Sequence, residues 1–165
     1  MDKLRFKDRQ VTGNVGLFFI CYNLSRMGWN VLPTSRNAKG IDILAYGKHG
    51  EKFLTIQAKG YTQTAAIGPF IKRTDVIADF YIVACDVYCS PRTYILSKNE
   101  VELLLTPPDK KGYLWVQFKD YGKPDFLGKW DKVGFGFFND AESEMINKID
   151  DKLNKDINII EQREN

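Results

Sequence analysis

The sequence is poor in the residues that build the commonest metal and redox sites. It contains one histidine, His49, and three cysteines, Cys21, Cys85 and Cys89, without the paired spacing of a zinc site. A zinc site is therefore not expected. Cys85 and Cys89 are four residues apart in a strand-like run, where buried reduced thiols are a commoner outcome than a ligand or redox pair.

Long apolar runs are also missing. The sequence contains no stretch of about twenty apolar residues, the length needed to cross a bilayer. The first ten residues, MDKLRFKDRQ, are too charged for the apolar part of a signal peptide. We therefore expect a cytoplasmic protein that does not contact membranes. Hydrophobic residues still make up 44% of the 165, which is enough for one sizeable core. This predicts a single domain over residues 1–165.

Acidic residues are scarce in the first part of the chain. Residues 1–99 hold 14 Lys and Arg against 7 Asp and Glu, a net charge of +7, whereas residues 100–165 hold 10 against 14, a net charge of −4. A basic surface binds nucleic acid because each phosphate that it neutralises releases counterions. Ordinary surface charge for solubility explains the same imbalance equally well.

Hydrophobic periodicity predicts an α/β fold. Apolar residues at helical spacing indicate a helix from near Thr12 to Gly28, and residues 68–79, with Pro69 in the first turn, are predicted as a second helix. Ser97 and Glu100 match a capping box before a short third helix. The expected extended or strand segments are 30–35, 41–46, 52–59, 80–88, 93–97 and 113–119. This order predicts a mixed central β-sheet flanked by helices on both faces, with a core over about residues 12–119.

The last part of the chain has two different patterns. Residues 120–138 are rich in glycine and aromatic residues and show no period, so their role is not predicted. Residues of about 140–162 place apolar side chains three or four apart, which indicates one face of a helix. That face either packs on the domain or forms the seam of a homodimer. An interaction protein that uses this helix and does not bind DNA is one functional alternative.

Two predicted strands carry charge near the same end. If His49 and Gly50 are the central residues of a tight hairpin, positions whose numbers sum to 99 face each other, so Asp42 lies opposite Gln57. Lys59 shares the face of Gln57 because it is two residues further along the strand. A carboxylate, an amide oxygen and an ammonium group would then converge, which suits a magnesium-assisted reaction of phosphates. A salt bridge between Asp42 and Lys59 explains the same pattern.

The segment GIDILA, followed after a short hairpin by IQAKG, resembles the core of the PD-(D/E)xK nuclease superfamily. The variant with Gln in place of the second acid is that of Mrr-type restriction endonucleases, and the layout is similar to archaeal Holliday-junction resolvases. The resemblance covers about residues 12–88. It implies a restriction-endonuclease-like core and a metal-dependent DNA endonuclease. By the resemblance, Mg²⁺ or Mn²⁺ would be held by Asp42, Gln57 and the main-chain carbonyl of Ala58, and Lys59 would be the catalytic lysine.

One departure from the family pattern favours a second function. Family members often carry a glutamate in the first helix, in a GNxGE pattern, whereas this chain reads GNVGL with Leu17 at that position. No acid is present from Val11 to Ile41. Since a missing carboxylate weakens magnesium binding, the alternative is a catalytically inactive DNA-binding module with a nuclease fold.

Several basic and polar residues are candidates for DNA contacts, because their positions in the sequence flank the charged end of the hairpin. These are Arg36, Lys39, Tyr61, Gln63, Lys72 and Arg73. Each is also compatible with a solvated surface. The sequence contains no helix-turn-helix, zinc finger or second domain that would read bases, so sequence specificity is not predicted.

Overall fold

The computed structural model describes residues 8–34, 40–137 and 145. The predicted C-terminal helix therefore lies, apart from Met145, outside the described residues. The elements are α1 Arg9–Arg26, β1 Asn30–Pro33, β2 Ile43–Tyr46, β3 Phe53–Gly60, β4 Ile67–Phe70, β5 Phe80–Cys85, β6 Arg92–Ser97, α2 Lys98–Leu104, β7 Leu114–Val116 and α3 Phe118–Tyr121, with two 3₁₀ turns, Arg73–Asp75 and Trp130–Val133.

The main sheet is mixed, as the sequence predicts. Its five strands lie in the order β1-β2-β3-β5-β6, and β3 and β5 are parallel whereas the other neighbours are antiparallel. A second, two-stranded sheet pairs β4 with β7. The chain therefore has an α/β fold, and the connection between the parallel strands contains β4 and a 3₁₀ turn.

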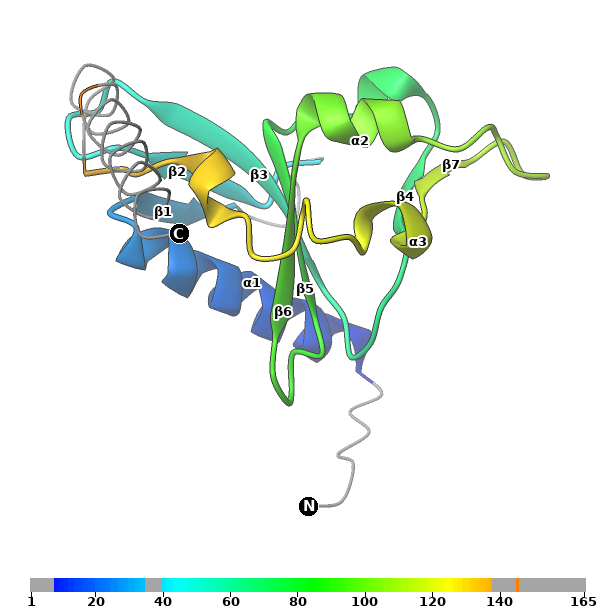
Figure 1. The fold of residues 1–165 in the computed structure, drawn as a ribbon, viewed down its shortest axis with the longest axis horizontal. Coiled ribbons are helices and arrows are strands. Elements are labelled where there is room, and N and C mark those ends of the chain that lie inside the picture. The colour runs from blue at the N-terminus through cyan, green and yellow to red at the C-terminus, as the bar shows by residue number, and fades with distance from the viewer. Residues whose placement is uncertain (1–7, 35–39, 138–144, 146–165) are drawn as a thin grey trace, which may run out of the picture.

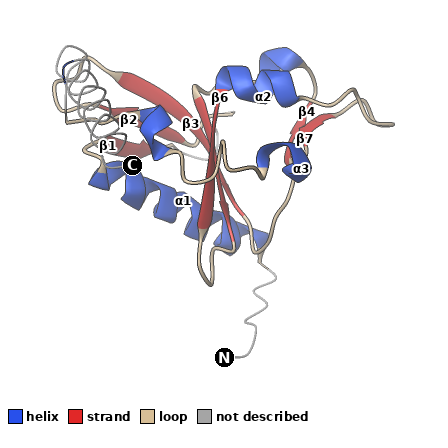
Figure 2. Ribbon diagram, in the orientation of Figure 1, coloured by secondary structure: helices blue, strands red, loops and turns tan. Residues whose placement is uncertain are grey.

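Both faces of the main sheet are covered (Figure 1). On one face, α1 buries Ile20 and Leu24 against the sheet, and we call this cluster the α1 core. On the other face, side chains of β5 and β6 pack against β4, β7, α2 and α3, and we call this cluster the small-sheet core. Figure 2 shows β4 and β7 beside α2 and α3, away from α1. The prediction of helices on both faces is confirmed.

The hairpin of β2 and β3 has the predicted register. Tyr46 pairs with Phe53 and Leu44 with Thr55, so the paired residue numbers sum to 99. Gly50 adopts a φ of 69°, which a residue without a Cβ tolerates. The short turn between β2 and β3 determines which of their residues face each other, so the register could be predicted from the sequence alone.

Helix α1 begins at Arg9, three residues before the predicted start. The reason is Asp8, whose carboxylate accepts hydrogen bonds from the backbone N–H groups of Gln10 and Val11 and so caps the helix. The predicted capping box at α2 is confirmed, because Ser97 and Glu100 each bond to the other's backbone N–H.

The prediction of a helix over residues 68–79 is wrong. Ile67 pairs with Val116 and Phe70 with Leu114, and all four side chains are buried in the small-sheet core. Gly68 has a φ of 134°, outside the helical region. Burial and pairing with a distant strand therefore override the local helical pattern in this segment.

The described part of the glycine- and aromatic-rich segment, residues 120–137, covers an edge of the main sheet. The backbone N–H of Ile95 in β6 donates to Phe126, and that of Gly128 donates to Thr93 in β6. Tyr94 also forms an isolated bridge with Leu127. Unpaired strand edges invite association with other chains, so this segment protects the outer side of β6.

Candidate active site

The carboxylate of Asp42 lies where β2 begins, next to the second half of β3. Its Oδ2 accepts hydrogen bonds from the Gln57 side-chain Nε2 and from the backbone N–H of Ala58, the latter at 2.9 Å. The backbone N–H of Asp42 donates to Ile56 O at 2.9 Å, and its carbonyl accepts from Thr34 N at 2.9 Å. The structure therefore brings Asp42, Gln57 and Ala58 together. The backbone of Asp42 is bonded on one side to β3 and on the other to the residue that follows β1.

Lys59 lies on the same face of β3 as Gln57, because side chains alternate along a strand. Its partner in the parallel pairing is Val83, whose side chain belongs to the small-sheet core. Within the described residues Lys59 forms no ion pair, with Asp42 or with any other acid. The structure therefore does not contain the Asp42–Lys59 salt bridge that was the purely structural explanation for these two charged residues.

The oxygen atoms of the site form a small donor set for a hard cation. Asp42 supplies one carboxylate, and the described residues contain no cluster of three or more His, Cys, Asp or Glu side chains. Gln57 directs its amide nitrogen toward Asp42, and rotation of the amide by about 180° exchanges nitrogen and oxygen within the same volume. One carboxylate with neutral oxygens fits Mg²⁺, which keeps several waters and takes further ligands from substrate phosphates.

Helix α1 does not supply a second carboxylate to this site. Leu17, at the position where the nucleases that the sequence resembles often carry a glutamate, packs with the α1 core. Asn14 is exposed and accepts a hydrogen bond from the Gln10 side chain at 3.0 Å. The acid that caps α1, Asp8, accepts two backbone hydrogen bonds at the helix start. Among the described residues, Asp42 is thus the single acid of the donor set.

The predicted DNA-contact residues differ in their surroundings. Gln63, Lys72 and Arg73 are exposed, and the guanidinium of Arg73 donates to the carbonyl of Glu102. Tyr61 is instead half-buried against the small-sheet core, and its hydroxyl donates to Ala66 O at 3.1 Å. Burial raises the pKa of Tyr61, so its hydroxyl stays protonated. Arg36 and Lys39 lie outside the described residues.

Two features next to the site were not predicted from the sequence. Asp79 joins the start of β5 to β3, because its carboxylate accepts from both the backbone N–H and the hydroxyl of Thr55. Gly40 has a φ of 77°, and a Cβ there would lie 2.9 Å from the Ile77 side chain and 4.0 Å from Gln57 Oε1. The glycine in RNAKG is a turn signal, but nothing in it indicated that the turn lies near Gln57.

The cysteines do not suggest a nucleophile or a metal ligand. All three are free, and Cys85 is buried whereas Cys89 is exposed. Burial, followed by the charge of Asp86, raises the pKa of Cys85 to about 11. A thiol with that pKa remains protonated at neutral pH and is a poor nucleophile.

Comparison of the chain with protein-family models, with curated proteins and with solved structures gives no match. In the part of the chain that the structure describes, none of the helices combines the length and apolar character needed to cross a bilayer. Function is therefore inferred from the residues of this chain and their geometry.

Proposed function

We propose that this protein is a Mg²⁺-dependent endodeoxyribonuclease of the PD-(D/E)xK type, which hydrolyses phosphodiester bonds in DNA as restriction or junction-resolving enzymes do. The observation that supports the proposal is the meeting of Asp42 with Gln57 and Ala58, with Lys59 on the same strand face. A carboxylate and an amide suit a hard cation, and a lysine that forms no ion pair within the described residues can stabilise charge on a phosphate.

Each of these residues has a distinct role in the proposed reaction. The Asp42 carboxylate, the Gln57 amide oxygen and the Ala58 carbonyl would hold Mg²⁺ or Mn²⁺. A bound divalent cation acidifies a water molecule and neutralises charge on a phosphate. Lys59 stabilises the negative charge that develops on the phosphate oxygens during attack. Gln57 must turn its amide for this role, since in the structure it donates to Asp42.

DNA as the partner is supported by charge. The net charge of +7 over residues 1–99 suits a phosphate surface, and exposed Lys72 and Arg73 belong to that part of the chain. A cytoplasmic location is part of the same proposal, because free thiols are typical of reducing compartments. A homodimer formed through residues 140–162 remains a prediction, since that segment is outside the described residues.

A second candidate function is a DNA-binding module that retains the fold without the chemistry. Two observations favour it. Leu17 packs in the α1 core at the position where the family carries an acid, and the Gln57 amide occupies one oxygen of Asp42 as a hydrogen-bond donor. The two candidates share DNA binding and differ in metal binding and cleavage.

The first test compares intact protein with Asp42→Ala, using exposed Asp125→Ala as the matched control. We expect cleavage of duplex, single-stranded or branched DNA in Mg²⁺ or Mn²⁺, its loss on chelation, and its loss in Asp42→Ala while DNA binding remains. The physical reason is that, without Asp42, only neutral protein oxygens face the cation. Electron paramagnetic resonance of added Mn²⁺ measures metal binding independently of cleavage.

Asp125→Ala is expected to cleave DNA and to bind Mn²⁺ as the intact protein does. Folded protein that binds DNA but cleaves none of these substrates, and binds no Mn²⁺, would contradict the nuclease proposal and support the inactive DNA-binding module. Circular dichroism of every variant establishes that loss of activity is not loss of folding.

A further inference from the structure

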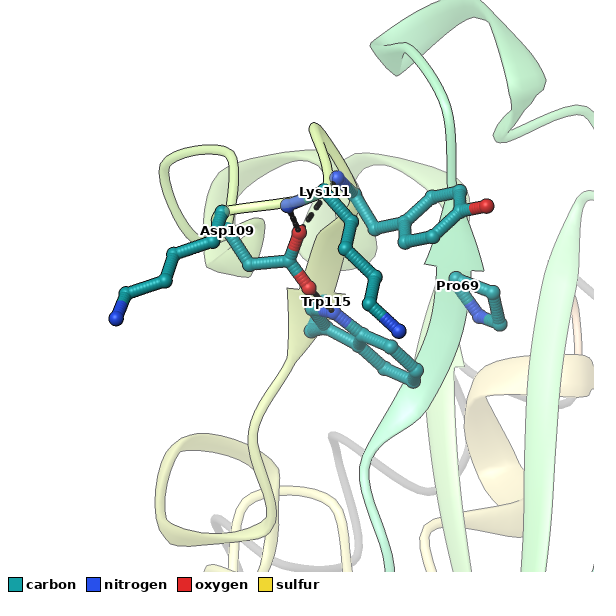
Figure 3. Close-up of a pocket in the computed structure, with 6 residues that line it drawn as sticks. Pro69, Asp109, Lys111 and Trp115 are labelled. Atoms are coloured by element: carbon teal, nitrogen blue, oxygen red, sulfur yellow. Dashed lines mark hydrogen bonds between the residues drawn. The ribbon is translucent and has the colours of Figure 1, made fainter.

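A hollow lies on the outer side of the small sheet, on a part of the chain with no role in the proposed reaction. Its volume is about 450 Å³, and it is lined by Pro69, Asp109, Lys110, Lys111, Tyr113 and Trp115 (Figure 3). This volume is within the range of about 300–1,000 Å³ that is usual for small-molecule sites. Its lining combines aromatic rings with two lysines.

The indole of Trp115 is held in a fixed orientation. Its Nε1 donates to Asp109 Oδ2 at 3.0 Å, and Oδ1 of the same carboxylate accepts from the backbone N–H groups of Lys111 at 2.8 Å and Tyr113 at 3.0 Å. Figure 3 shows these bonds converging on Asp109. The hydrogen bond from the Tyr113 backbone, followed by the one from the Trp115 side chain, lowers the pKa of Asp109, so the acceptor stays ionised at neutral pH. A ring fixed in this way loses little entropy when a planar group stacks on it.

Gly68 allows the indole to lie close to β4. A Cβ at Gly68 would be 3.0 Å from Trp115 Cε3, and the φ of 134° at this position also requires glycine. The edge of Trp115 is therefore supported by the backbone of the neighbouring strand. Pro69, next to it, is exposed and continues the apolar wall of the hollow.

The charges around the hollow favour an anion. Lys110 and Lys111 are exposed, and neither forms an ion pair among the residues that the structure describes. Asp109 is the only acid among the six lining residues, so two positive side chains accompany one negative side chain whose oxygens already accept hydrogen bonds. A ligand with a planar aromatic part and a phosphate fits both the rings and the lysines.

We propose that this hollow binds an unpaired nucleotide of the DNA substrate, with the base stacked on Trp115 and Tyr113 and the neighbouring phosphates at Lys110 and Lys111. The inference rests on the proposed function and deepens it by naming the substrate class. A base within a duplex has both faces covered by its neighbours, whereas an unpaired base offers a face for stacking. Tailed or branched DNA is therefore the preferred substrate.

The location of the hollow agrees with this role. The small sheet packs through Ile67 and Leu114 against Tyr81 and Val83 of β5, and these side chains are on the face of the main sheet that also carries Lys59. The hollow and the candidate active site thus belong to the same side of the main sheet. A DNA strand that follows this side would contact both.

The test measures DNA binding in a chelator, so that cleavage plays no part. Fluorescence anisotropy compares a labelled blunt duplex with the same duplex carrying an unpaired tail. We expect the intact protein to bind the tailed DNA more tightly and Trp115→Ala to weaken that binding about fivefold or more, the effect of losing one stacked base. Lys110→Ala/Lys111→Ala should weaken it as well. Binding of the blunt duplex by Trp115→Ala should remain unchanged.

Two controls match these substitutions. Phe18→Ala removes an aromatic ring that is 62% exposed on α1, on the opposite side of the main sheet, and Lys98→Ala/Lys129→Ala removes two exposed lysines elsewhere. Both should keep the preference for tailed DNA. If circular dichroism shows that Trp115→Ala is unfolded, the surface variant Lys110→Ala/Lys111→Ala decides the question.

The outcomes separate this inference from the nuclease proposal. The nucleotide site would be overturned if the intact protein bound tailed and blunt DNA equally. It would also be overturned if folded Trp115→Ala or Lys110→Ala/Lys111→Ala kept the preference for tailed DNA. Either result would leave the nuclease proposal standing. A preference that depends on Trp115 in a protein that never cleaves DNA would support the site and contradict the nuclease. Absence of any DNA binding would overturn both.

Discussion

Gln57 is the residue on which the chemistry of the site depends most. Its amide donates to Asp42 in the structure, and the same side chain must present oxygen to a cation in the proposed reaction. The sequence predicted that these two residues meet, because the hairpin register is local. It did not predict which end of the amide faces Asp42, since this depends on the hydrogen bonds available around the carboxylate.

Replacing this amide by a carboxylate gives the first prediction. Gln57→Glu places two negative groups together, so each carboxylate resists ionisation beside the other and the variant is destabilised at neutral pH. A bound cation relieves the repulsion, and a ligand that binds only the folded state raises its stability, by about 2.7 kcal/mol at a hundred times its dissociation constant. Thermal unfolding with and without Mg²⁺ should show a larger Mg²⁺ effect on Gln57→Glu than on the intact protein.

Gln63→Glu is the matched control for that measurement, because Gln63 is exposed and the substitution changes the charge equally. If Mg²⁺ raised the unfolding temperature of Gln57→Glu and of Gln63→Glu by the same amount, the cation would not be bound at Gln57. That result would remove the metal site from the proposal.

Among the elements, the contact between α1 and β3 supports the site from behind. A Cβ at Gly16 would lie 2.3 Å from Gly60 Cα and 3.6 Å from the carbonyl carbon of Lys59, so the helix and the strand approach each other closely at this point. Only glycine on both sides permits this distance. The helix thereby fixes the backbone of Lys59 from the side of the sheet opposite to the site.

Gly16→Ala should therefore destabilise the protein by about 1–3 kcal/mol, the cost typical of forcing extra atoms into a packed interior. Gly13→Ala is the matched control in the same helix, because a Cβ there meets nothing within 4 Å. Gly13→Ala should stabilise the protein by roughly 0.5–1 kcal/mol, because alanine is a better helix former than glycine. Urea unfolding measures both, and a Gly16→Ala variant as stable as the intact protein would show that the two glycines are not in contact.

The elements also show where prediction from sequence succeeds. The hairpin of β2 and β3 and the capping box of α2 depend on residues close together in the chain, and both were predicted. The segment of residues 68–79 was predicted as a helix from its local pattern. The strand β4 at its start was missed because it pairs with Leu114–Val116, far away in the sequence. The start of α1 was missed because the cap at Asp8 precedes the apolar pattern.

At the scale of the whole molecule, the sequence predicted the fold class and the side chains at the charged end of the hairpin. It could not predict the hollow at Trp115, since Pro69 and Lys111 become neighbours only through the pairing of β4 with β7. Nor could it predict that residues 120–137 cover the edge of β6, because the bonds to Thr93 and Ile95 are made by backbone groups rather than by a recognisable motif.

The whole molecule also places its charge and its chemistry in the same part of the chain. Residues 1–99, with a net charge of +7, contain Asp42, Gln57 and Lys59, whereas residues 100–165, with a net charge of −4, contribute most of α2 and all of α3 and β7 to the small-sheet core. Within the described residues Lys59 forms no ion pair, and it shares a strand face with Gln57, whose amide is bonded to Asp42. This combination is the centre of the nuclease proposal.

The most direct test of that centre is the rate of Mg²⁺-dependent nicking of plasmid or branched DNA by Lys59→Ala, with exposed Lys98→Ala as the matched control. If Lys59 stabilises the reacting phosphate, its loss should reduce the rate by about 100-fold or more, as removal of one electrostatic stabiliser does, while DNA binding largely remains. Lys98→Ala should nick DNA at the rate of the intact protein. Cleavage by folded Lys59→Ala at the unaltered rate would show that the activity does not belong to this site.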